Sequence, residues 1–389
     1  MCRGTSRCAW LQAKARPLNP EASLSQSFNT WNVILLPQKP GTPASVIPKA
    51  AQCDKSLFNC VKRDDTGLDP DPVIIVRGIT HMKAITLHYP VQTIDRNEIL
   101  SAETVLSPRT MESLISPERK TPLQAMSLLQ YGTVRDDLLK FLSQPPNNAI
   151  YDGQERVAEV MDLMNGIKLI LPVLQSLQYF RENDFGTYRH ILLVSSLATL
   201  LLKDLVPNHA ERIRETATGP THDFGKICIP LSILKKSSPL TRTERGILEH
   251  HAAAGFVLLV HYLQDPNHIA ARVARDHHER KDGSGYPRGI RLDTELVEIV
   301  AVSDVYDALI SPRPYRPKAF DNRTAIEEIT RMAERNEIGW EPVKALVARN
   351  RRSKPDHREC SVALTKRGTP PEGNLYGLIA EDDEVEKDS

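Results

Sequence analysis

The stretch DHHERKDGSGYPRG, residues 276–289, places two adjacent histidines directly before a glycine-rich turn. Neutral imidazole is the commonest metal ligand in proteins, so His277 and His278 are candidate ligands. Neighbouring side chains on a helix point about 100° apart, which suits two adjacent metal ions better than one. The run Gly285-Tyr286-Pro287 then ends the stretch in a turn. This segment predicts metal ligands with a loop beside them.

Similar histidine and aspartate clusters recur along the second half of the chain, roughly 25 to 32 residues apart. That spacing equals about one helix and its connection, so successive helices of a bundle can bring the clusters to one centre. Imidazole and carboxylate suit Fe, Mn or Zn, and no cysteine lies among them. The predicted metal ligands are His190, His222, Asp223, one of the adjacent His250 and His251, His277, His278 and Asp304.

Two metal ions held close together suit hydrolysis of a phosphate ester, since they can clamp both reacting oxygens. Lys226 lies three residues after Asp223, so both project from one face if the segment is helical. A cation there could bind a non-bridging phosphate oxygen. The residues thus predict a multinuclear phosphohydrolase centre with Lys226 as its phosphate-binding cation.

The hydrophobic pattern predicts a mainly α fold. Apolar residues recur at threes and fours in 157–180, 189–205, 241–263, 294–310 and 324–336. Thr241 and Glu244 form a capping box, and Ser107 with Pro108 opens a short helix. By contrast, β-branched runs in 72–94 predict short strands.

We expect five regions. They are a loosely structured extension (1–70), a small β-containing module (72–120), a helical linker (121–150), a helical catalytic domain (151–350) and a polar acidic tail (351–389). The fold class is therefore an all-helical bundle preceded by a small mixed α/β or β module.

Composition is that of an ordinary globular protein, with 40% hydrophobic residues, 25% charged residues and a net charge of +1. Such a balance provides no bulk attraction to nucleic acid. The most apolar run, 190–206, is short of a membrane span, so we expect no span and a cytoplasmic location. The six cysteines form no C-x-x-C pair, which favours a reducing compartment.

Four segments resemble the HD-GYP family, a bacterial branch of the HD-domain metal phosphohydrolases. They are HDFGKICIP (222–230), HHAAAG (250–255), HHERKDGSGYPRG (277–289) and SDVYDALISPRPYRP (303–317). The resemblance spans about 180–320 with strong motifs, and 277–289 is its most specific part. It implies an all-helical domain with two or three metal ions, Fe or Mn foremost, that hydrolyses cyclic di-GMP.

The resemblance also implies roles for individual residues. His251, four residues before Gly255, would be the ligand of the 250–251 pair. Asp223 would bridge the metals, His277 and His278 would complete the shell of one metal, and Asp304 would bind the other. Lys226 would contact the scissile phosphate. Gly285, Tyr286 and Pro287 would border the substrate, which Arg313 and Lys318 would contact, and Glu279 and Asp307 would orient ligands.

The chain departs from the family pattern at Gly186. Trinuclear members carry a glutamate one turn before the upstream histidine, here His190. Glycine has no side chain to bind a metal, so the resemblance implies two divalent metal ions rather than three.

Three functions remain open at this point. The first is hydrolysis of cyclic di-GMP to linear pGpG by attack of a metal-bridging hydroxide, with GMP left open as an alternative end product. The second is a catalytically weak signalling module that binds a cyclic dinucleotide or partner proteins. The third is hydrolysis of another cyclic dinucleotide. The N-terminal module could recruit protein partners, and a homodimer is left open.

Overall fold

The computed structural model describes residues 84–115, 123–208, 212, 215–313, 318–372 and 379–381. These residues belong to one compact unit, Arg77–Ser389. The predicted extension 1–70 lies outside the described residues, as do 72–83 of the predicted β module and the last part, 382–389, of the predicted tail.

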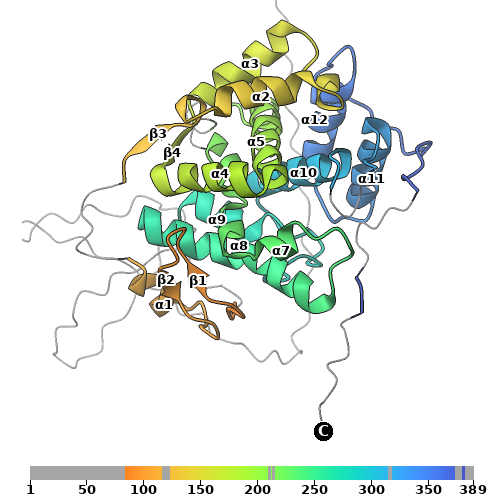
Figure 1. Cartoon of the computed structure of the whole chain (residues 1–389). Coiled ribbons are helices and arrows are strands. Elements are labelled where there is room, and N and C mark those ends of the chain that lie inside the picture. The colour runs from red at the N-terminus through yellow and green to blue at the C-terminus, as the bar shows by residue number, and fades with distance from the viewer. Residues whose placement is uncertain are drawn as a thin grey trace, which may run out of the picture. The chain divides into compact units, whose positions relative to one another are not determined.

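The described chain is a bundle of helices, as its hydrophobic pattern predicts (Figure 1). The helices are α1 (Pro108–Ser113), α2 (Val134–Ser143), α3 (Gln154–Asn165), α4 (Leu171–Asn183), α5 (Phe185–Leu205), α7 (Leu231–Leu234), α8 (Arg242–Leu263), α9 (Ile269–Asp276), α10 (Glu295–Ile310), α11 (Asn322–Glu334) and α12 (Trp340–Asn350). Short 3₁₀ helices include η3 (Gly219–Thr221) and η4 (Phe224–Cys228). The helix caps predicted at Ser107 and Thr241 are both confirmed.

Helix α5 forms the centre of the bundle. It packs against α4, α10, α12 and η3, and its residues from Ile191 to Leu202 are all buried. This helix is long and apolar enough to cross a membrane, but 83% of its apolar window is buried inside the protein. Its apolar character is therefore accounted for by core packing.

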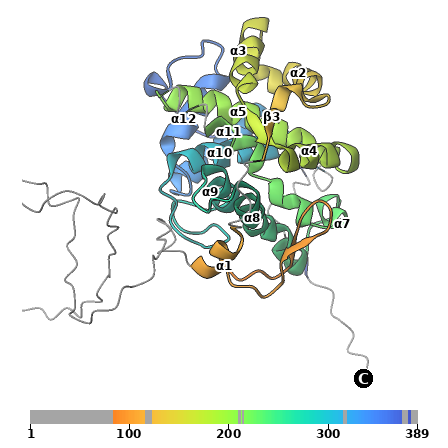
Figure 2. The same ribbon diagram turned by 90° about the vertical axis from the view of Figure 1, so that its left-hand side faces the viewer.

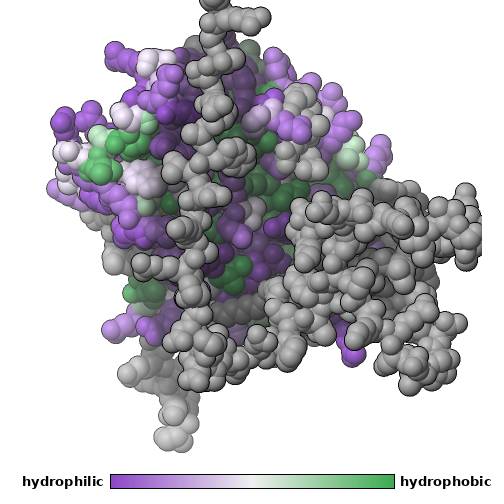
Figure 3. Space-filling model, turned by 180° about the vertical axis from the view of Figure 1, so that it is seen from behind, coloured by the Kyte–Doolittle hydropathy of each residue, from purple (hydrophilic) through white to green (hydrophobic). Residues whose placement is uncertain are grey.

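A second group of helices lies beside this centre. Helix α8 packs along α9 and against η4, and both figures show α8 and α9 side by side (Figures 1 and 2). On the face seen in Figure 3, the described surface is mostly hydrophilic with scattered hydrophobic patches. The apolar stripes of the helices therefore face inward.

The β structure is small. Strand β1 (Val91–Gln92) pairs antiparallel with β2 (Glu98–Leu100), and β1 packs on α8. Strand β3 (Ala125–Ser127) pairs antiparallel with β4 (Lys168–Ile170). Because β3 joins β4 and α2 packs on α5, residues 123–143 are part of the bundle rather than a separate linker.

Two expected helical stretches end earlier than their patterns indicate. The 157–180 stretch divides into α3, β4 and α4, with Gly166 and Pro172 at the break. Glycine is unfavourable inside a helix, and proline is favourable in the first turn of one, so the chain leaves α3 at Gly166 and starts α4 around Pro172. The apolar spacing nevertheless continues across the break. Likewise α9 ends at Asp276, so His277 and His278 follow the helix instead of lying on it.

Candidate metal centre

His190 on α5 and Asp304 on α10 meet at the centre of the bundle, where His190 Nε2 lies 2.9 Å from Asp304 Oδ1. The third member of this group is His222, which follows η3. Gly219 of η3 allows this approach, because a Cβ there would lie 2.9 Å from the Cα of Ser195 on α5. Close packing of η3 on α5 thus brings His222 to His190.

Asp223 is held against α8 by a second close approach. A Cβ on Gly225 would lie 2.0 Å from the carbonyl oxygen of His251 and 2.4 Å from the nitrogen of Gly255. Because Gly225 has none, η4 sits directly on the α8 backbone. Asp223 Oδ1 then lies 3.5 Å from His251 Nε2, while its Oδ2 lies 3.3 Å from His222 Nε2.

Lys226 also contacts this carboxylate. Its Nζ lies 2.6 Å from Asp223 Oδ2, and its side chain is 15% exposed, whereas that of Asp223 is 2% exposed. The predicted i, i+3 relation is therefore present on η4. Although burial opposes ionisation, Lys226 and His222 hold the pKa of Asp223 well below its usual range. The aspartate is thus an anion at neutral pH.

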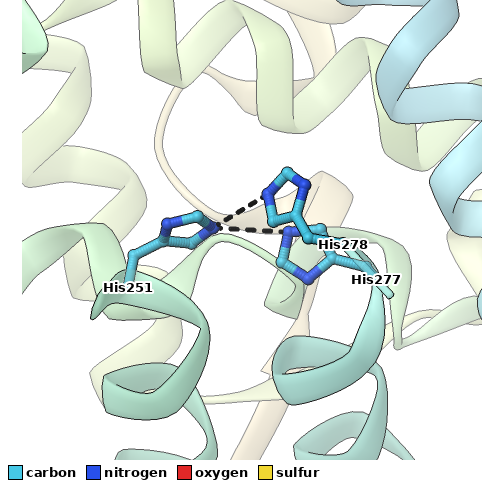
Figure 4. Close-up of side chains that lie close together, drawn as sticks. All are labelled: His251, His277 and His278. Carbon is cyan, nitrogen blue, oxygen red and sulfur yellow. Dashed lines mark hydrogen bonds between the residues drawn. The ribbon is translucent and has the colours of Figure 1, made fainter. Parts of the chain in front are cut away.

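The ring of His251, from the middle of α8, converges with those of His277 and His278, which follow the end of α9 (Figure 4). His251 Nε2 lies 3.4 Å from His277 Nε2 and 3.2 Å from His278 Nε2. The adjacent pair therefore joins one group with His251, although His277 also lies within a group formed with His222 and Asp223. The expectation that the two adjacent histidines lie on a helix and point about 100° apart is wrong here, because α9 ends before them.

The other ring nitrogens determine which way the lone pairs point. The Nδ1 atoms of His222, His251 and His277 lie 2.6 Å, 2.6 Å and 3.0 Å from the carbonyl oxygens of Gly219, Leu248 and Ala274. A carbonyl only accepts, so each Nδ1 carries the proton. In the neutral rings each Nε2 is then a lone-pair acceptor that faces the centre.

This arrangement leaves the lone pairs on the Nε2 atoms of His251 and His277 facing each other. Burial lowers the pKa of His251 to about 4 and that of His277 to about 3, so both rings are neutral at pH 7. Their Nε2 atoms, 3.4 Å apart, therefore have no proton to share. His222 Nε2 is buried without a hydrogen-bond partner among the described residues. A cation between such atoms relieves the repulsion, so the donor set fits metal ions.

The Asp223 carboxylate lies between the two outer groups. One group is His190, His222 and Asp304, and the other is His251, His277 and His278. One carboxylate oxygen faces each group. The geometry suits one cation on each side, with Asp223 reaching both.

The Gly285-Tyr286-Pro287 loop folds back on the histidine pair. A Cβ on Gly285 would lie 2.2 Å from the carbonyl oxygen of His278, so only glycine permits this approach. The Tyr286 ring stacks on the His278 ring, with centroids 4.5 Å apart and planes inclined by 20°. The loop therefore lies beside one metal group.

Glu279 was expected to orient the histidine rings, and this expectation is wrong. Its carboxylate instead accepts hydrogen bonds from the backbone nitrogens of Arg288 and Ile290, at 2.7 Å and 3.0 Å. Glu279 therefore holds the backbone that follows the Gly285-Tyr286-Pro287 loop, which we call the signature loop. Both partners lie nine or more residues away, so they follow from the loop's tertiary path.

Asp307 and Arg313 form a second layer around His190. Asp307 Oδ2 lies 2.6 Å from His190 Nδ1, so it accepts that proton and directs His190 Nε2 inward. Arg313 Nη2 lies 3.9 Å from the same carboxylate oxygen and 3.1 Å from the same ring nitrogen. Lys318 is exposed, and it belongs to none of the contacts described at the centre.

The remaining histidine of the α8 pair, His250, faces away from the groups. Its ring meets the edge of Tyr89 at 5.6 Å, next to strand β1. The sequence did not indicate the roles of Gly219, Gly225 or the three backbone carbonyls. The one available signal was the glycine two residues after Asp223, because a glycine beside a ligand often marks a close backbone approach.

Comparison with known proteins identifies the domain. A profile of the HD domain matches residues 173–339, which contain all seven predicted ligands. The chain is 42% identical over 136 residues to the cyclic di-GMP phosphodiesterase response regulator RpfG of Xanthomonas campestris, covering 34% of this chain and 36% of that protein. Residues 173–339 of this chain are therefore similar to the HD domain, and the match to RpfG favours its HD-GYP branch.

Two further relatives match the same part of the chain. A cyclic di-GMP phosphodiesterase of Thermotoga maritima is 36% identical over 155 residues, covering 39% of this chain and 42% of the relative. The 3'3'-cGAMP-specific phosphodiesterase 3 of Vibrio cholerae is 35% identical over 132 residues, covering 33% and 28%. The matches thus span less than half of the relatives' length.

A solved structure, Bd1817, a HDG"Y"P protein of Bdellovibrio bacteriovorus, aligns with 68% of this chain and 97% of its own. Its TM-score is 0.35 at 15% identity, which is too low to bear on the details of this site.

Proposed function

We propose that this protein is a metal-dependent phosphodiesterase that hydrolyses cyclic di-GMP to linear pGpG, and the product assay below decides whether hydrolysis continues to GMP. The observation that carries the proposal is the placement of Asp223 between two groups of buried, inward-facing histidine and aspartate side chains, with Lys226 at its side. The relatives named as cyclic di-GMP phosphodiesterases support the substrate class.

Two divalent cations, Fe or Mn in preference, would be held by the His190 group and the His251 group, with Asp223 facing both. When bound, they would lower the pKa of water and screen the negative charge of the phosphate. Gly186 provides no third ligand site, because it has no side chain to contribute. The ligands themselves suit several metals, so the preference for Fe or Mn rests on the resemblance.

The chain's own residues would do the rest. Asp223, ionised at neutral pH, would hold and orient the attacking water. Lys226, which is partly exposed, would donate to a non-bridging phosphate oxygen as negative charge develops there. Tyr286, stacked on His278, would form one wall for the cyclic dinucleotide. Hydrolysis would break one P–O3′ bond, add the water oxygen to phosphorus and leave the proton on O3′.

Arg313 and Lys318 are proposed to contact the second phosphate or a base. Arg313 supports this less directly than expected, since its guanidinium also reaches Asp307 and His190. A second substrate deserves testing because one relative is named as specific for 3'3'-cGAMP. A cytoplasmic location, protein partners and a homodimer remain predictions.

The test combines anaerobic metal analysis with product chromatography on cyclic di-GMP and 3'3'-cGAMP. We expect about two metals per chain, linear product from cyclic di-GMP, and loss of both in Asp223→Ala. Asp136→Ala on exposed α2 is the matched control and should keep both. Metal-loaded protein that binds cyclic di-GMP without cleaving it would instead support the signalling module.

A further inference from the structure

A basic cavity of about 280 Å³ lies between α8, α9 and the segment that follows the signature loop. The charged side chains that line it are Arg272, Arg275, Arg288 and Arg291, with Asp276 and Asp293. Four positive charges thus face two negative ones. None of these residues belongs to a metal group in the described chain.

The floor of this cavity has two guanidinium groups that share one carboxylate. Arg275 binds Asp276 through Nε at 2.7 Å and through a terminal nitrogen at 2.8 Å. Arg288 Nη2 donates to the same Asp276 Oδ1 at 2.8 Å. All three side chains are buried, with at most 9% exposed. Burial, together with the neighbouring Arg275, lowers the pKa of Arg288.

One donor on this floor has no acceptor. Arg288 Nε is buried without a hydrogen-bond partner in the described chain. The closest paired carboxylate oxygen, Glu279 Oε1, is 3.9 Å away and already accepts the backbone N–H of Arg288. A buried guanidinium donor left unsatisfied is costly, so the floor favours an additional acceptor.

The mouth of the cavity carries more positive charge. Arg272 on α9 and Arg291 after the loop are exposed, and both line the cavity. Arginine is well suited to phosphate because its planar fork binds two oxygens together. We propose that this cavity binds a small phosphate-bearing molecule, with the phosphate held between Arg288 at the floor and Arg272 and Arg291 at the mouth.

The phosphate site is connected to the metal centre through the chain. Asp276 directly precedes His277, and Arg288 directly follows Pro287. The Arg288–Asp276 contact therefore joins the two ends of the segment that carries the histidine pair and the loop. A phosphate that binds Arg288 would compete with Asp276 for its guanidinium and so weaken the contact that joins the two ends.

The test measures binding by titration calorimetry on the full metal-containing chain, without turnover. The probes are inorganic phosphate and GMP. Arg272→Gln combined with Arg291→Gln removes two exposed charges, and Arg242→Gln with Arg352→Gln removes two exposed charges outside the cavity lining. Asp223→Ala serves to remove anion binding at the metal centre. The Nε–H resonance of Arg288 provides a direct local readout.

We expect saturable binding that weakens about tenfold or more in the Arg272/Arg291 variant, because each lost guanidinium contact is worth about that factor. The Arg242/Arg352 and Asp223 variants should bind within about twofold of the parent, and the Arg288 Nε–H signal should shift. If GMP binds more tightly than inorganic phosphate, the ligand is a nucleotide. If the two affinities are equal, the ligand is the free anion. Three results would each overturn the proposal: binding that is unchanged in the Arg272/Arg291 variant, binding that is lost only in Asp223→Ala, or the absence of saturable binding. None of these results depends on whether the protein hydrolyses cyclic di-GMP.

Discussion

Replacing Gly225 by alanine probes the contact that places Asp223 against α8. The new Cβ would lie 2.0 Å from the carbonyl oxygen of His251 and 2.4 Å from the nitrogen of Gly255. Both are backbone atoms, so no side chain can rotate away. Ordinary contact begins near 3.4 Å, so η4 and α8 must separate by about 1.4 Å.

Overpacking of this kind costs about 3 kcal/mol where the neighbours cannot yield. For a domain of this size, we expect Tm to fall by about 6–12 °C. Metal content should fall as well, because Asp223 lies two residues from the clash and its contact with His251 Nε2 is already 3.5 Å. The assays are calorimetric melting and elemental analysis of the purified variant.

Gly246→Ala is the matched control. Gly246 lies in α8, the helix that η4 contacts, is exposed, and a Cβ there would meet nothing within 4 Å. It should raise stability by about 0.5–1 kcal/mol, since alanine is a better helix former than glycine. If Gly225→Ala has the same Tm as this control and keeps its metals, the close approach of η4 and α8 does not hold the centre together.

Lys226→Ala should lower turnover of cyclic di-GMP by about 10²–10³-fold with metals retained, and metal loss in elemental analysis would contradict its assigned role. Glu279→Gln should raise KM more than it lowers metal content, because one carboxylate holds two backbone amides of the loop exit; steady-state kinetics with metal analysis separates the two effects. Gly186→Glu should raise the metal count per chain from about two to three, and an unchanged count would remove Gly186 as the cause of a binuclear centre. Chelation should lower the free energy of unfolding by about 2.7 kcal/mol for each metal site that was at 100 times its Kd, and Tm should fall with it; an unchanged Tm in calorimetric melting would argue against coupling of the metals to the fold.

The sequence predicted most of the helices because each has an amphipathic period and several carry local caps, such as Thr241 with Glu244. It predicted less well where local and apolar signals conflict. Apolar spacing continues from α3 through β4 into α4, and only the pairing of β3 with β4 identifies a strand there. That pairing joins residues more than forty positions apart, which no local pattern indicates.

The sequence by itself determined the chemistry of the centre. The types and spacing of its histidines and aspartates, with Lys226 one 3₁₀ turn after Asp223, are fixed in the chain. Tertiary structure decided how they combine. Which histidines share a group, which ring nitrogen faces inward and what Glu279 holds all depend on backbone carbonyls and amides brought together by folding. The same is true of the basic cavity, because Arg272, Arg288 and Arg291 become neighbours only when the signature loop packs back against α9. Side-chain chemistry is local to the chain, whereas backbone approach at van der Waals distance is a property of the packed core.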